Sequence, residues 1–87
     1  MAKEYTTTNA HGTKYHFKDP EMTILHREDG PAVEYEGDGG VWFLNGMVHR
    51  TDGPAYISND GSKSWYVNGV FIFEISRISN QLVKRMK

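Results

Sequence analysis

The chain has 87 residues, a formal net charge of −1 and no cysteine, which limits it to one small domain without disulfides or thiolate metal sites. Its 10 basic and 11 acidic side chains argue against a general nucleic-acid binder, because such a protein needs a basic surplus to neutralise phosphates. No apolar run is typical of a signal peptide or approaches the roughly 20 residues that cross a bilayer, so we expect a cytoplasmic protein that is not attached to a membrane.

Two segments of the chain repeat one another at a spacing of 23 residues. Residues 26–46 align with residues 49–69 without a gap and with nine identities in 21 positions. The identities lie in His-Arg-x-Asp-Gly-Pro-Ala at the start of each segment and in Trp-aromatic-aliphatic-Asn-Gly at its end. A fixed period of this kind predicts a repeat architecture, in which each unit buries its apolar face against its neighbours.

The first part of the chain is expected to hold a terminal segment and an imperfect copy of the unit. We assign residues 1–10 to an N-terminal segment and residues 11–25 to a degenerate first repeat. In this copy Tyr15 or Phe17 takes the place of the tryptophan, and a longer loop at 19–22 replaces the Asn-Gly turn. Terminal repeats are often atypical because they cap the stack.

Each full unit, 26–48 and 49–72, predicts strand, turn and strand. Asn-Gly between two apolar runs supplies the positive φ that a type I′ hairpin turn requires. Proline lacks an amide donor and therefore stands at the start of a strand, as in the Asp-Gly-Pro that precedes 32–35 and 55–57. The sum is a mainly β domain, an antiparallel meander of hairpins.

The last 15 residues, 73–87, depart from the repeat and predict a short α-helix. Apolar residues fall three and four apart along them, which is the spacing of one helix face: Ile75, Ile78, Leu82 and Met86. Glu74 stands early and the basic residues stand late, as the helix dipole prefers. We expect this helix to close the open end of the sheet within the same single domain, 1–87.

The combined pattern Gly-x-x-Trp-aromatic-aliphatic-Asn-Gly-x-x-His-Arg-x-Asp-Gly-Pro-Ala resembles the MORN-like repeats, in the variety found in small phage and bacterial proteins. The resemblance covers residues 11–72. It implies a ribbon of β-hairpins, and related proteins are described as antitoxins or linked to scaffolding and membrane attachment. A short chain of this kind looks like a phage-encoded accessory protein that disables a host enzyme or defence factor.

The repeated His-Arg-x-Asp-Gly-Pro-Ala motif allows a functional and a structural interpretation. His26 and His49 could serve as metal ligands or as bases beside Asp29 and Asp52, although zinc would want further ligands. The structural interpretation is favoured, since a motif present once per unit usually makes the shape of that unit. Aspartate can accept bonds in its turn or pair with arginine, and glycine and proline fix the backbone. The residues assigned to structure are His26, Arg27, Asp29, Gly30, Pro31, Asn45, Gly46, His49, Arg50, Asp52, Gly53, Pro54, Asn68 and Gly69.

Two aromatic pairs and a basic tail are the candidate contacts for a partner. Within each pair, Trp42 with Phe43 and Trp65 with Tyr66, one ring should point to the core and the other outward. Outward rings that line up across strands would form an adhesive stripe; alternatively, both faces of the sheet are covered. The tail adds a basic cluster that could touch phosphate or anionic lipid, or could simply complement the helix dipole: Arg77, Lys84, Arg85 and Lys87.

No phosphate-binding loop, nucleophile triad or paired carboxylates are present, so we expect no enzyme, no cofactor and no metal. The expected function is a non-catalytic module that binds and inhibits a host protein in the cytoplasm of the host cell. The alternatives are an antitoxin-like partner of a toxin and a module for attachment to a membrane or scaffold. Pairing of exposed sheet edges would also allow a homodimer.

Overall fold

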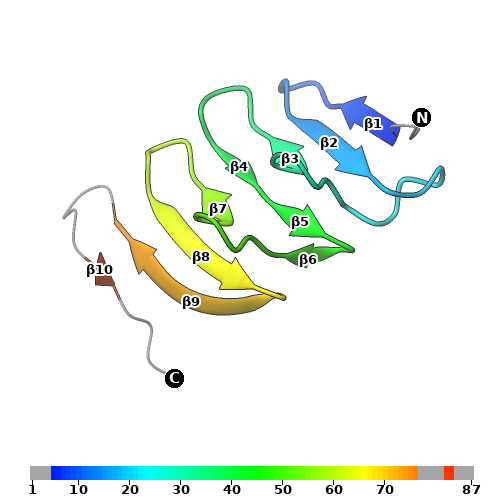
Figure 1. The fold of residues 1–87 in the computed structure, drawn as a ribbon. Coiled ribbons are helices and arrows are strands. Elements are labelled where there is room, and N and C mark those ends of the chain that lie inside the picture. Colours follow the sequence, from blue (N-terminus) through cyan, green and yellow to red (C-terminus); the bar gives the residue numbers. More distant parts are fainter. Residues whose placement is uncertain (1–4, 77–81, 84–87) are drawn as a thin grey trace.

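The computed structural model describes residues 5–76 and 82–83, and these residues form a single twisted layer of antiparallel strands (Figure 1). Eight strands lie in one sheet in the order in which they occur along the chain, and two others form a small separate ribbon. No helix occurs within the described ranges. The predicted mainly β, antiparallel meander is therefore present.

The strands are short, and most are joined by tight turns. The main sheet has the order β1-β2-β3-β4-β7-β8-β9-β10, and the ribbon pairs β5 with β6. Their bounds are β1 Tyr5–Thr8, β2 Lys14–Phe17, β3 Val33–Glu34, β4 Gly40–Val41, β5 Phe43–Leu44, β6 Met47–Val48, β7 Tyr56–Ile57, β8 Lys63–Val67, β9 Val70–Ile75 and β10 Leu82–Val83.

The two Asn-Gly turns close hairpins, as their sequence predicts. Leu44 pairs with Met47 across the first turn, and Val67 pairs with Val70 across the second. Asn45 and Asn68 both adopt φ of 52°, and the glycines that follow them adopt 82° and 81°. These left-handed conformations match the type I′ geometry, which is why asparagine and glycine stand there.

The two repeat units have the same backbone hydrogen bonds, displaced by 23 residues. Arg27 N–H donates to the carbonyl of Phe43, and Arg50 N–H donates to that of Tyr66, both at 3.1 Å. Likewise the glycine N–H of each Asn-Gly turn donates at 2.8 Å to a carbonyl of the preceding unit. Bonds between units therefore recur with the same period as the sequence.

The imperfect first copy places His16, not Tyr15 or Phe17, where the full units have tryptophan. His16 N–H donates to Ala32 O, and its own carbonyl accepts from His26; Trp42 makes the same two bonds one unit later. The prediction was wrong because it looked for an aromatic ring next to this position, whereas Gly12 and Gly61, both with positive φ, stand four residues before His16 and Trp65. The loop after β2 is three residues longer, so that the spacing from His16 to Trp42 is 26 rather than 23.

The predicted helix over 73–87 is wrong for the described part of that range. Residues 73–75 continue β9 in register with β8, and Leu82 and Val83 form β10 against β9. The ring of Phe73 stacks on that of Trp65 with centroids 4.5 Å apart, so residues 73–75 complete the pairing of the long strand β8. The remaining positions, 77–81 and 84–87, lie outside the described residues.

The N-terminal segment, to which no structure was assigned, supplies the first strand of the sheet. Tyr5 through Thr8 pair with Phe17 through Lys14 of β2. Tyrosine and three threonines in succession have high strand propensity, which is the signal for this strand.

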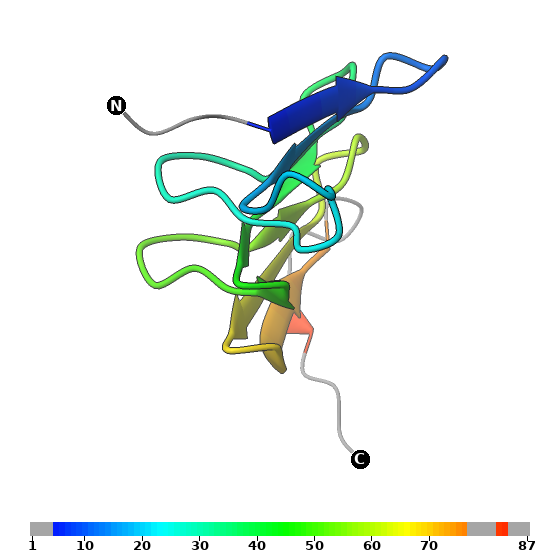
Figure 2. The same ribbon diagram turned by 90° about the vertical axis from the view of Figure 1, so that its right-hand side faces the viewer.

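The sheet is one layer, and two loops project from one side of it (Figure 2). These loops are residues 26–32 and 49–55, which carry the repeated motif. Among the described apolar residues only Ala32, Val33 and Ala55 are buried, and no large side chain is fully enclosed. Within the same ranges, no helix of the length and apolar character needed to traverse a bilayer is present.

Candidate partner-binding surface

The face of the sheet from which the two loops project, here called the loop face, carries the rings of His16, Trp42 and Trp65. Continuing the strand registers by one residue places Ala32 between the first two of these rings and Ala55 between the last two. Both alanines have no exposed surface. Rings and methyl groups thus alternate along this row, and they form the small core of the domain.

An arginine from each loop contacts one of these rings, Arg50 over the face of Trp42 and Arg27 at Nε2 of His16. The Cζ atom of Arg50 is 4.1 Å from the centre of the Trp42 ring. Its Nε donates to Asp52 at 2.9 Å, and its Nη1 donates to the carbonyl of Pro54 at 3.0 Å. Arg27 makes the corresponding bonds to Asp29 and Pro31. The motif therefore folds each loop back on the sheet.

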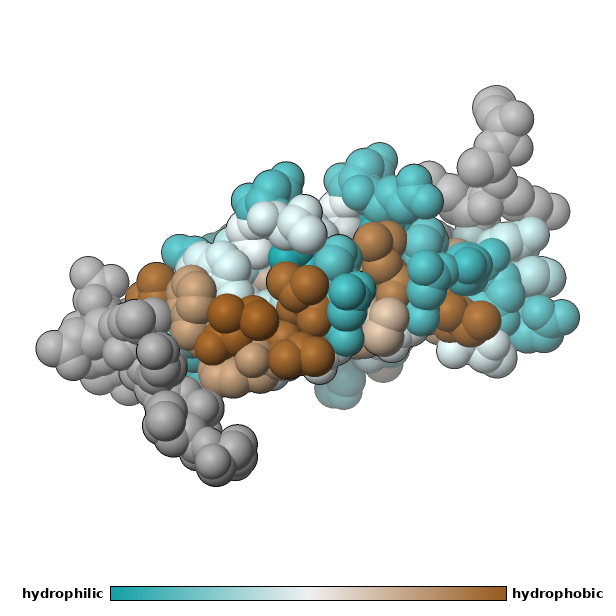
Figure 3. Space-filling model, turned by 60° about the horizontal axis from the view of Figure 1, so that its bottom comes forward, coloured by the Kyte–Doolittle hydropathy of each residue, from teal (hydrophilic) through white to brown (hydrophobic). Residues whose placement is uncertain are grey.

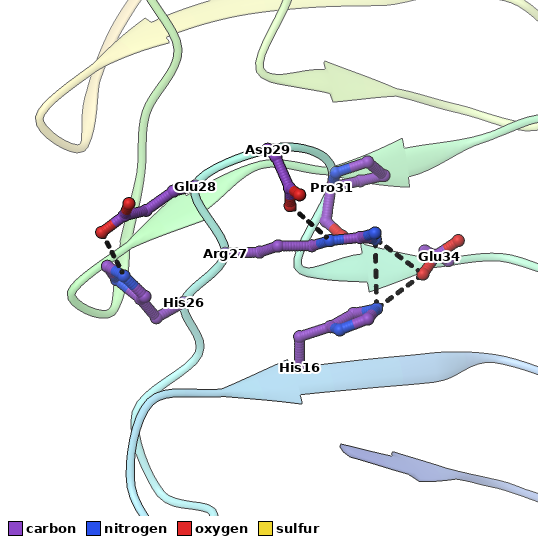
Figure 4. A network of polar contacts seen from close by, with 7 residues as sticks. All are labelled: His16, His26, Arg27, Glu28, Asp29, Pro31 and Glu34. Carbon is purple, nitrogen blue, oxygen red and sulfur yellow. Dashed lines mark hydrogen bonds and ion pairs between the residues drawn. The ribbon is translucent and has the colours of Figure 1, made fainter. Parts of the chain in front are cut away.

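In the first unit the arginine meets a buried histidine and a carboxylate (Figure 4). Oε2 of Glu34 lies 2.6 Å from Nε2 of His16 and 2.9 Å from Nη1 of Arg27. The hydrogen bond from His16, with the charge of Arg27 nearby, holds the pKa of the Glu34 carboxyl below its ordinary value. These polar groups satisfy one another, as buried groups must.

The two motif histidines are committed to the scaffold. Nδ1 of His26 accepts the backbone N–H of Asn45, and Nδ1 of His49 accepts that of Asn68, both at 2.9 Å. Each histidine therefore fixes the Asn-Gly turn of its neighbouring hairpin. Among the described residues, no group of three or more potential ligands could hold a metal ion. In both histidines Nδ1 is already engaged by a backbone amide.

A pocket of about 400 Å³ lies between the two loops on the loop face. The guanidinium groups on its walls are already paired with aspartates of their own loops. Its lining carries three carboxylates, at Glu28, Asp29 and Asp52, against two guanidinium groups, so it offers no surplus of positive charge. We interpret this pocket as the gap between two similar loops.

The opposite face of the sheet, here called the aromatic face, presents two rows of apolar side chains. In the first row Tyr15, Val33, Val41 and Tyr56 lie in register across four strands. Two residues further along the strands, the second row contains the register pairs Tyr5–Phe17, Phe43–Val48 and Tyr66–Phe71.

Most of the aromatic face is half-buried, although the described elements form only a single layer. Its rings contact one another, with Tyr15 and Phe17 stacked at 6.5 Å and Tyr66 edge-on to Phe71 at 5.4 Å. Burial raises the pKa of the Tyr35 hydroxyl, with the nearby Tyr56 as a further cause. From β1 to β8, no strand position on this face carries a charged side chain.

A third feature is an apolar ridge along the hairpin turns. Ile24, Met47 and Val70 stand 23 residues apart and are 39%, 44% and 62% exposed. Figure 3 brings the lower side of Figure 1 forward and shows a band of hydrophobic residues between hydrophilic ones. Ile24 and Met47 each lie beside the glycine of the next Asn-Gly turn, at ordinary van der Waals distance from where a Cβ atom on that glycine would stand.

The candidate contacts divide between the two faces. Phe43 and Tyr66 lie on the aromatic face and line up at equivalent positions of successive units. Trp42 and Trp65 lie on the loop face, and all four rings are half-buried rather than one in and one out. Arg77, Lys84 and Arg85 lie outside the described residues.

Sequence reasoning named only two members of the aromatic face. The missed residues are Tyr5, Tyr15, Phe17, Tyr35, Tyr56 and Phe71. Their signal was the two-residue alternation of Tyr15 with Phe17 and of Val41 with Phe43, which marks one face of a strand.

The fold and the surface define a class of protein. It is a single-layer antiparallel meander in which loops cover one face and aromatic side chains line the other. Comparisons of the chain with protein-family models, curated proteins and solved structures found no match.

Proposed function

We propose that this protein is a non-catalytic binding module that engages a partner protein through its aromatic face. The observation that carries the proposal is the pair of apolar rows on that face, rich in tyrosine and phenylalanine. Large aromatic side chains dominate the energetics of protein interfaces, because they bury much area at a small entropic cost.

The charge of the face favours a protein over other partners. A nucleic acid or an anionic membrane would require basic side chains beside the rings, and on the aromatic face none stands at a strand position from β1 to β8; Lys14 and Lys63 lie on the loop face. Hydroxyl groups of Tyr15, Tyr56 and Tyr66 would supply hydrogen bonds at the rim of such an interface.

The hydrogen bonds on the loop face support the same function. The arginine and histidine of each motif are bonded within their own unit, and the arginines also contact the preceding unit, Arg27 at His16 and Arg50 over Trp42. These bonds hold the hairpins in register before any partner arrives, which lowers the entropy lost on binding.

We further propose that the chain is a MORN-like repeat protein encoded by a phage, which binds and inhibits a host enzyme or defence protein in the host cytoplasm. The support is the 23-residue period, in sequence and in the bonds between units. An antitoxin or an attachment module would use the same surface, and the identity of the bound partner separates these roles.

The test compares two double variants on the same strands. Phe43→Ser with Tyr66→Ser removes two rings from the aromatic face. Leu44→Ser with Val67→Ser changes the next residue of each strand, which lies on the other face. The partner is captured from bacterial lysate with the wild-type chain and identified, and its affinity for each variant is then measured by calorimetry.

We expect the aromatic-face variant to bind at least about tenfold more weakly, since two interface rings are worth more than about 1.4 kcal/mol. The control should stay within about threefold of the wild type. Circular dichroism and thermal unfolding verify that both variants fold. A loss confined to the control would assign binding to the loop face or the apolar ridge and contradict the proposal, as would full affinity in both.

A further inference from the structure

The first strand leaves one edge of the main sheet open. β1 pairs with β2 on one side, and no described segment pairs with its other side. Exposed edges in natural proteins are usually blunted by lysine, proline or a bulge. Tyr5–Thr8 has none of these, and its four residues, one tyrosine and three threonines, all favour strands.

The hydrogen bonds of the neighbouring strands show which groups of β1 face outward. Asn9 N–H donates to Thr13 O, so Asn9, Thr7 and Tyr5 direct their backbone groups toward β2. His16 stands opposite Thr6, but its N–H and its carbonyl bond to Ala32 and His26 on the other side. The N–H and C=O groups of Thr6 and Thr8 therefore point away from the sheet.

These outward groups are arranged symmetrically about Thr7. If a second copy pairs antiparallel with Thr7 opposite Thr7, each Thr6 faces the Thr8 of the other copy. Each such pair exchanges two N–H to O=C bonds, which gives four bonds in all. In this twofold pair position 7 faces itself and position 6 faces position 8 of the other copy, so a charge at position 7 would face a like charge. In β1 only threonines meet, and threonine pairs across strands are favourable.

We propose that β1 is a dimerisation edge, at which two copies of this chain join with Thr7 on the twofold axis. The two sheets of eight described strands then form one continuous sheet of sixteen. The aromatic faces of both copies lie on the same side of it. This dimer is independent of the partner proposed above, because it uses backbone groups and not the aromatic rings of the central strands.

The absence of cysteine allows a test of the register by single-cysteine variants. Thr7→Cys places the two thiols in a non-hydrogen-bonded pair with Cα atoms about 4.5 Å apart, within the range of a disulfide. Thr6→Cys is the matched control, because in this register Thr6 faces Thr8 of the other copy. The two copies of Thr6 are therefore two residues apart along the strands, a displacement of about 7 Å. Mild oxidation should link Thr7→Cys into a covalent dimer at least about tenfold faster than Thr6→Cys.

The dimer itself is measured by analytical ultracentrifugation over a range of concentrations. Thr6→Pro removes an outward N–H without touching the bonds to β2, so the monomer should fold while the dimer weakens at least about tenfold. Thr6→Val keeps the N–H and should dimerise like the wild type. The double variant Phe43→Ser with Tyr66→Ser should dimerise normally even if it loses its partner.

Two results would overturn the proposal. One is a wild-type chain that stays monomeric at every concentration up to about 1 mM, which would leave a strand of another protein as the occupant of the edge. The other is equal cross-linking rates for Thr7→Cys and Thr6→Cys.

Discussion

The guanidinium of Arg50 lies over the ring of Trp42, with its Cζ 4.1 Å from the ring centre. In the preceding unit Arg27 holds the equivalent position, with Nη1 3.2 Å from Nε2 of His16. In both cases the arginine comes from a loop and the ring from the sheet, His16 from β2 and Trp42 from the residue between β4 and β5. This contact, made once per unit, couples the repeated motif to the row of rings that forms the core.

The first prediction concerns Arg50. Arg50→Lys keeps the charge but loses the planar guanidinium group, which bonds to Asp52 and to the carbonyl of Pro54 while it lies over Trp42. We expect the free energy of unfolding to fall by about 1–2 kcal/mol, measured by urea denaturation. Lys63→Gln, an exposed control, should change it by less than about 0.5 kcal/mol. Equal stability of Arg50→Lys and wild type would show that the guanidinium geometry contributes nothing to the free energy of unfolding.

The second prediction concerns His49. His49→Phe keeps a ring but removes the Nδ1 acceptor, so the N–H of Asn68 loses its partner. Stability should fall by about 1 kcal/mol, and the Asn68 amide should exchange with solvent faster. His26→Phe should act alike on Asn45, whereas exposed His11→Phe should change little. An unchanged exchange rate at Asn68 would refute the scaffold role of His49.

The third prediction is a pH dependence that originates at Glu34. Its carboxyl has a folded pKa below the ordinary value of 4.5, because His16 and Arg27 stabilise the charged form. A carboxyl with a lowered folded pKa adds stability above its unfolded pKa and loses it as the pH falls through the folded value. We therefore expect unfolding temperatures to drop as the pH is lowered below about 4.5.

The variants for this test are Glu34→Gln and a surface control. Glu34→Gln should be less stable than the wild type at pH 7, and the difference should shrink toward pH 2, because the wild-type carboxyl is then neutral as well. Glu21→Gln, at an exposed position, should track the wild type throughout. A constant difference between Glu34→Gln and wild type from pH 7 to pH 2 would contradict the prediction.

The fourth prediction tests the strand at 73–75. Phe73→Ala removes the ring stacked on Trp65 and should cost about 1–2 kcal/mol in thermal or urea unfolding. Ile72→Ala removes a side chain that is 46% exposed at the bulge of β9 and should cost clearly less. If the two losses were equal, the stacking contact would not be what secures the end of β9.

Local chemistry determined much of the fold from the sequence alone. Asn-Gly acts through positive backbone φ, and the proline of Asp-Gly-Pro acts through its missing amide donor, so they fix turns and strand starts wherever they occur. The antiparallel meander follows from these signals because its turns join neighbouring strands. The same reasoning assigned the motif histidines and arginines to structure, although not their bonds to the next hairpin.

Tertiary contacts decided the rest. The spacing of Ile75 and Leu82 suits a helix, yet β8 offered unpaired backbone groups that residues 73–75 satisfy as a strand. His16 takes the place of a tryptophan, because its place in the unit is set by its backbone bonds to Ala32 and His26 and not by the kind of ring it carries. Alternation shows which rings share a face of the sheet. Which of the two faces stays open depends on the side toward which the loops fold. That side is set by the contact of Arg50 with Trp42 and by the contact of Arg27 with His16.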